Sequence, residues 1–136
     1  MTVDSVALIV VDAANVVGSR PDGWWRDRSG AARRLLARMP RLRDQLAEPA
    51  ELIVVLEGAA KAAVDAADPE SGGVIVVLAD GSGDDAIVDV VAAARAEDGR
   101  RSITVVTADR GLRDRVAALG AEVVGPSWLL DRLGGS

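Results

Sequence analysis

Acidic side chains recur where the apolar segments of this sequence end. The segments SVALIVV, ELIVVL, GVIVVLA and SITVVT each run into an acid within two residues, and a pair of aspartates follows soon after the third. The acids concerned are Asp12, Glu57, Asp80, Asp84, Asp85 and Asp109. Carboxylates gathered at one place repel each other, and a bound cation relieves that repulsion. Magnesium prefers oxygen ligands, keeps several waters and often uses only one or two carboxylates directly.

The absence of two residue types narrows the chemistry further. The 136 residues include no histidine and no cysteine, but 21 aspartates and glutamates. A Ser-His-Asp triad, a thiol nucleophile, a disulfide framework and the usual zinc sites are therefore excluded. Acid–base or metal chemistry must rest on carboxylates. Two oxygen-bound ions can activate a water and stabilise the leaving oxygen of a phosphodiester without histidine.

The apolar segments predict strands that alternate with helices. Short β-branched runs indicate buried strands at 5–11, 51–56, 73–79, 102–107 and 121–124. Helices are predicted at 30–46, where Pro40 should kink or split the helix, and at 58–67, 84–97, 110–119 and 126–133. Residues 13–29 are predicted to form a loop, because glycines and a proline punctuate them. We therefore expect one α/β domain over 1–136, with a mostly parallel five-stranded sheet between two helical layers.

In such sheets ligands bind beyond the carboxyl ends of the strands, so the strand-end acids are expected to lie together. Structural roles compete with this hypothesis. Asp109 could cap the following helix, and Ser82 with Asp85 could form a capping box. Asp84 could simply favour the helix dipole, and Glu57 could be a solvated strand end. A functional role is favoured for Asp12, because no helix is expected to start there.

Two polar residues near these acids are further site candidates. Asn15 could orient the Asp12 carboxylate or contact a phosphate, although an Asx turn is the structural alternative. Thr107 could donate a hydrogen bond to a ligand or to Asp109, although it is also an ordinary β-branched strand residue.

The overall composition indicates where the protein is located and whether it associates with a membrane. Hydrophobic residues make up 49% and charged residues 27%, a balance typical of soluble globular proteins. No apolar run approaches the roughly 18 residues that would span a bilayer, and the first residues lack the basic region of a secretory signal. We expect a cytoplasmic protein with no membrane association.

Positive charge is concentrated in one part of a chain whose net charge is −5. Between Arg20 and Asp44 there are eight arginines against three acids. Arginines can neutralise phosphates, and adjacent tryptophans can stack on unpaired bases. The expected RNA-contacting residues are Arg20, Trp24, Trp25, Arg26 and Arg28. Alternatively, the tryptophans cover the core and the later arginines form a solvated helix face.

Three segments together resemble a known family. They are VDAANVVG from Val11, SGDDAIV from Ser82 and TADRGL from Thr107. In this order they resemble the acidic motifs of NYN domains, a branch of the PIN-like nucleases, and they span nearly the whole chain.

The resemblance implies a sheet order of 3-2-1-4-5 and a ribonuclease that depends on Mg²⁺ or Mn²⁺. By motif, Asp12, Asp85 and Asp109 would be its catalytic, metal-site carboxylates. Asp84 would be an alternative member and Asn15 an orienting residue. Glu57 lies where many relatives end their second strand with an acid. The partner implied is RNA, which we expect to be single-stranded.

Two alternatives to a ribonuclease stay open. One is a magnesium-dependent nucleotide pyrophosphohydrolase, since acid clusters serve both reactions. The sequence contains no GxxxxGK[ST] motif, which argues against a P-loop NTPase. The other is a non-catalytic module that binds RNA or protein and keeps the acids for capping or metal-assisted folding. A receiver-like domain is disfavoured because the only lysine is Lys61.

Overall fold

The computed structural model describes residues 6–19, 26–46, 49–58, 70–71 and 74–133. Five parallel strands form the sheet: β1 (Ala7–Asp12), β2 (Ala50–Leu56), β4 (Val74–Leu78), β5 (Ile103–Val106) and β6 (Glu122–Val124). A two-residue strand, β3 (Glu70–Ser71), pairs antiparallel with β4 at one edge. The order is β3-β4-β2-β1-β5-β6. The five predicted strands are thus confirmed in the order 3-2-1-4-5, and β3 was not predicted.

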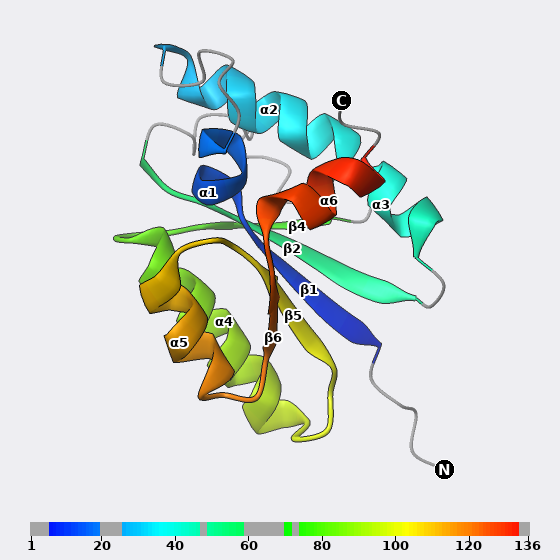
Figure 1. The fold of residues 1–136 in the computed structure, drawn as a ribbon, viewed down its shortest axis with the longest axis vertical. Coiled ribbons are helices and arrows are strands. Elements are labelled where there is room, and N and C mark those ends of the chain that lie inside the picture. The colour runs from blue at the N-terminus through cyan, green and yellow to red at the C-terminus, as the bar shows by residue number, and fades with distance from the viewer. Residues whose placement is uncertain (1–5, 20–25, 47–48, 59–69, 72–73, 134–136) are drawn as a thin grey trace.

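The helices form two layers, as Figure 1 shows. One face of the sheet is covered by α1 (Ala13–Gly18), α2 (Arg28–Arg38), α3 (Pro40–Gln45) and α6 (Pro126–Arg132), and the other by α4 (Gly83–Glu97) and α5 (Arg110–Ala117). The three-layer α/β/α architecture is therefore confirmed. No helix among the described residues is long and apolar enough to cross a membrane.

Alternating strand residues build a separate core on each face. In β1, Ile9 and Val11 pack under α1, α2 and α6, while Leu8 and Val10 pack under α4 and α5. Successive side chains of a strand point to opposite faces, so a strand buried on both sides is apolar throughout. Fully burying each such side chain contributes about 1.5–3 kcal/mol to stability. β1 lies between β2 and β5 in the sheet, and five of its six residues are buried.

Two helical predictions have clear outcomes. Pro40 splits the predicted long helix, because α2 ends at Arg38 and α3 begins at Pro40, whose missing N–H suits the first turn of a helix. The loop prediction for 13–29 is wrong at both ends, since α1 occupies Ala13–Gly18 and α2 begins at Arg28. The helix predicted at 58–67 lies outside the described residues, apart from Gly58.

The chain reverses direction of winding at β1. From β1 it moves through β2 to β4 on one side, then returns to β5 and β6 on the other. The carboxyl ends of β1 and β5 therefore flank a topological switch point, where open α/β sheets bind ligands. Asp12 ends β1 here, beside the residue that follows β5.

Candidate functional site at the acidic edge

Asp12 is a buried carboxylate held by hydrogen bonds from two directions. Its side chain is among the buried polar groups of the described residues, with 5% exposure. Thr107 Oγ1 donates to Asp12 Oδ2 at 2.9 Å, and the Asn15 backbone N–H donates to Oδ1 at 3.3 Å. The second bond makes Asp12 the N-cap of α1. Burial raises the Asp12 pKa more than these hydrogen bonds lower it, and the charges of Asp84 and Glu57 raise it further.

The segment after β5 is tied to Asp12 by a relay of hydrogen bonds. The fully buried Thr107 donates to Asp12, and its Oγ1 also accepts from the Asp109 backbone N–H at 3.1 Å. Asn15 Oδ1 accepts from the Ala108 backbone N–H at 2.8 Å. Asp109 then caps α5 by accepting from the Leu112 N–H at 2.9 Å. Thr107 and Asn15 thus fix the position of Asp109 relative to Asp12.

Glu57 connects the end of β2 to the start of α4. Its half-buried side chain accepts a hydrogen bond from the Gly83 backbone N–H through Oε2 at 2.9 Å. A Cβ on Gly83 would lie 2.9 Å from Glu57 Oε1, so only glycine allows this approach without a shift. Ser82 starts the helix by accepting from the Asp85 N–H at 3.1 Å.

The two aspartates of α4 face different surroundings. The Asp84 pKa is raised by partial burial first, and then by the charges of Asp109 and Glu57. The Arg115 charge lowers it, and the neighbouring Asp85 raises it slightly. The Asp85 side chain is 70% exposed and forms an ion pair with Arg115, at 2.9 Å between Oδ1 and Nη2. Asp84 therefore belongs with Asp12, Glu57 and Asp109, a set that we call the acidic edge. Asp85 lies beside it and has its own partner.

The donor set of the acidic edge suits a hard, hydrated cation. All its side-chain donors are carboxylate oxygens, which Mg²⁺ and Mn²⁺ prefer. Burial raises the Asp84 pKa most, and Asp109 and Glu57 raise it further by a repulsion that a cation would relieve. In the part of the chain that the structure describes, no three acidic side chains converge closely enough to hold an ion as they stand. An ion here would have only one or two of these carboxylates as direct ligands, with water as the rest of its shell, a form of binding that Mg²⁺ often adopts.

The other predicted residues are placed as follows. Arg26 and Arg28 are both exposed, and Arg28 is the first residue of α2. Asp80 is exposed in the turn before α4. Arg20, Trp24 and Trp25 lie outside the described residues.

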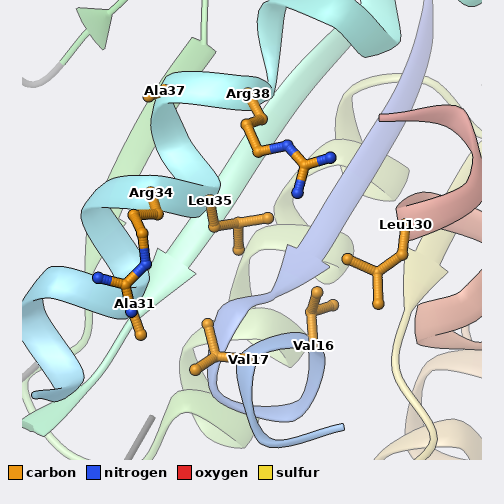
Figure 2. A pocket seen from close by; sticks show the side chains of 8 residues that line it. All are labelled: Val16, Val17, Ala31, Arg34, Leu35, Ala37, Arg38 and Leu130. Atoms are coloured by element: carbon orange, nitrogen blue, oxygen red, sulfur yellow. The ribbon is translucent and has the colours of Figure 1, made fainter. Parts of the chain in front are cut away.

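Two hollows on the α1–α2 face were not predicted. The smaller, of about 230 Å³, is lined by Ala13, Ala14, Val17 and Ala32 together with Arg28 and Glu57. The larger, of about 460 Å³, lies among α1, α2 and α6 and includes Arg34, Arg38 and again Val17 (Figure 2). No local motif marks these hollows, because their walls come from separate elements. The Arg115 partner of Asp85 also had no sequence signal.

Comparisons with known proteins bear on the fold. No family model and no curated protein matches this sequence. Crystal structures of Rae1 (YacP) from Bacillus subtilis and of a point mutant of it are similar, each with a TM-score of 0.73 over 95% of this chain. The identities are 19% and 18%, and the matches cover 74% and 76% of the Rae1 chains. At this identity the likeness establishes the fold alone: this chain has the three-layer, PIN-like α/β/α fold of Rae1.

Proposed function

We propose that this chain is a ribonuclease of the NYN/PIN-like kind that hydrolyses RNA phosphodiesters with the help of Mg²⁺ or Mn²⁺. The observation that carries the proposal is the acidic edge. Four carboxylates from the ends or starts of different elements act on one another at the switch point of the sheet. Such crowding costs stability, and perturbed carboxylates in one place are a signature of functional sites.

Each member of the acidic edge has a distinct part in this proposal. Asp12 is held in one orientation by Thr107 and Asn15, so it would be the fixed point of a cation site. Asp84 and Asp109 would complete the site, and Glu57 would close its side toward β2. A divalent cation bound here would activate a water for attack on phosphorus and offset charge on the leaving oxygen.

Support for RNA as the substrate comes from two sources. The segments VDAANVVG, SGDDAIV and TADRGL resemble the acidic motifs of NYN domains, and the fold is PIN-like. In addition, Arg28 lines the same hollow as Glu57, so a positive charge lies on the hollow that includes a member of the acidic edge. A cytoplasmic location and single-stranded RNA remain parts of the proposal.

The test is cleavage of end-labelled single-stranded RNA in Mn²⁺, with EDTA as the metal-free condition. The decisive variants are Asp84→Asn and Asp85→Asn, because they make the same change of charge at adjacent residues. We expect Asp84→Asn to lower the cleavage rate by more than about 100-fold, since even outer partners of metal sites typically cost about 10- to 100-fold. Asp85→Asn should retain most of the activity, because Asp85 is exposed and paired with Arg115.

The results of this experiment distinguish the roles of Asp84 and Asp85, the need for a metal and the type of reaction. Loss of cleavage in Asp85→Asn but not in Asp84→Asn would reverse the roles of the two aspartates. Equal cleavage in EDTA would refute metal dependence. If folded wild-type protein cleaves no RNA but hydrolyses a small nucleoside triphosphate, the pyrophosphohydrolase would replace the ribonuclease.

A further inference from the structure

The two hollows on the α1–α2 face adjoin each other, and the smaller one includes a residue of the acidic edge. We call the two hollows together the groove. Val17 lines both of them, so the two hollows adjoin at this residue. At its other end the smaller hollow includes Glu57, a member of the acidic edge. The groove therefore extends from Glu57 past α1 to the larger hollow among α1, α2 and α6, whose lining Figure 2 shows.

The groove combines an apolar floor with guanidinium groups. Its floor is formed by valine, leucine and small alanine side chains, and Arg34 and Arg38 lie on the α2 side (Figure 2). These two arginines are four residues apart, so they lie on the same side of the helix. Arg38 Nη2 donates to the Leu133 carbonyl at 3.0 Å, which holds this guanidinium in place, whereas Arg34 is exposed.

We propose that this groove binds the single-stranded RNA chain on its way to or from the acidic edge. The inference rests on the proposed function, and it assigns the substrate surface that the function needs. Flat bases can lie on an apolar floor while arginines contact phosphates, which is how sequence-tolerant single-strand sites are built. The positive charge of Arg34 and Arg38 complements a polyanion, although the whole chain carries a net charge of −5. Because the smaller hollow includes Glu57 and adjoins the larger one at Val17, the occupant favoured is a polymer long enough to reach both places.

The test compares neighbouring arginines of α2. Arg34 lines the groove, whereas Arg33 is also exposed on the same helix but does not line either hollow. The variants Arg34→Ala and Arg33→Ala therefore remove the same charge inside and outside the groove. The measurement is fluorescence anisotropy of a fluorescein-labelled single-stranded RNA, in EDTA and again in Ca²⁺, over a series of salt concentrations.

We expect Arg34→Ala to weaken RNA binding about two- to fivefold relative to Arg33→Ala, the range set by a partly exposed ion pair. The slope of log affinity against log salt should fall by about 0.7, the value for one phosphate contact on a single strand. A second pair of variants tests the lining of the groove. Ala37→Glu places an acid in the groove, and Ala93→Glu places one at an exposed position of α4, in the opposite helical layer. The first should weaken binding severalfold more than the second.

Failure of this inference can be told apart from failure of the proposed function. If the wild type binds RNA through Arg34 but cleaves no RNA, the RNA-binding groove is supported and the ribonuclease proposal is refuted. If it cleaves RNA while Arg34→Ala and Arg33→Ala bind equally well, the groove is refuted and the ribonuclease stands. No RNA binding by the wild type in either condition overturns the groove. A wild-type dimer that Ala37→Glu dissociates without changing RNA affinity would assign the groove to a second copy of the chain.

Discussion

The two edges of the sheet treat charge in opposite ways. At the amino edge, where the strands begin, arginines are satisfied by carbonyls and an acid. Arg95 donates to four backbone carbonyls, at 2.7 to 3.1 Å, and Arg101 donates to the Val6 carbonyl at 2.7 Å and pairs with Glu51 at 3.3 Å. At the acidic edge, the charges that act on Asp12 are those of Asp84 and Glu57, and both raise its pKa.

This difference indicates which edge serves stability and which serves function. Charged hydrogen bonds to carbonyls that end helices and begin strands hold the amino edge together. Repulsion among partly buried carboxylates has no such benefit and persists where a ligand compensates for it. Removing a charge should therefore lower the stability of the protein at the amino edge and raise it at the acidic edge. Stability measurements on variants of the two edges can test this difference.

The largest effect is expected at the amino edge, from Arg95→Met. Methionine keeps much of the apolar stem but leaves the carbonyls of Gly99, Arg101, Leu119 and Gly120 without this donor. We expect the free energy of unfolding to fall by about 2–3 kcal/mol, the range for hydrogen bonds with a charged partner. Urea denaturation at neutral pH measures it.

The matched control for Arg95→Met is Arg113→Met, at an exposed position of α5. It should change the free energy of unfolding by less than about 0.5 kcal/mol. If the two variants change the free energy of unfolding equally, water replaces the Arg95 guanidinium as hydrogen-bond donor. The arginines of the amino edge would then not stabilise the fold.

A smaller effect of opposite sign is expected from Asp84→Asn. This variant removes a carboxylate whose pKa is raised above the ordinary value of 3.8 by burial and by Asp109 and Glu57. Asp85→Asn makes the same change one residue later, where the carboxylate pairs with Arg115. Both lose the favourable interaction of an acid with the N-terminus of α4, so the difference between them combines the relief of the acidic edge in Asp84→Asn with the loss of the Arg115 ion pair in Asp85→Asn. Asp84→Asn should therefore have the higher melting temperature of the two.

The pH dependence of Asp84→Asn follows from the direction of the pKa shift. Because the folded state binds this proton more tightly than the unfolded state, the group's contribution to stability falls as pH rises from 3.8 through the folded pKa. The advantage of Asp84→Asn over the wild type should thus be present above the folded pKa and diminish as pH falls toward 3.8. An advantage that is constant across this range would mean that the carboxylate is not the cause.

The fold could be predicted because its strands are buried on both faces, so each one is a continuous apolar run with a clear end. The short helix α1 was missed because Val16, Val17 and Gly18 are weak helix formers. Its stability comes from tertiary features: Asp12 caps it, and Ala13 and Val16 are buried against the sheet. Asp12 therefore has the structural role that the sequence did not suggest, in addition to its place in the acidic edge.

The candidate site could be predicted only to the level of its strand ends. Adjacent helical residues point about 100° apart, so a pair such as Asp84 and Asp85 does not face the sheet edge equally. Sequence alone does not say which one does, because the answer depends on how α4 packs and on Arg115 from α5. The groove likewise needs α1, α2 and α6 in place, and no segment contains more than one of its walls.

The smallest effect on stability, and the finest test of the contrast between the edges, is expected from Gly83→Ala. The new methyl group would lie 2.9 Å from Glu57 Oε1 and 3.0 Å from Cδ, so the Glu57 carboxylate must move. Because a side-chain end can shift cheaply, the free energy of unfolding should change by less than about 0.5 kcal/mol. Gly111→Ala is the control, since its methyl group would be in ordinary contact with Asp109 Oδ1, at 3.5 Å in the first turn of α5. RNA cleavage in Mn²⁺ should fall severalfold in Gly83→Ala and stay near wild type in Gly111→Ala. If Gly83→Ala cleaves as fast as the wild type, the position of Glu57 does not matter to the reaction, and the acidic edge reduces to Asp12, Asp84 and Asp109.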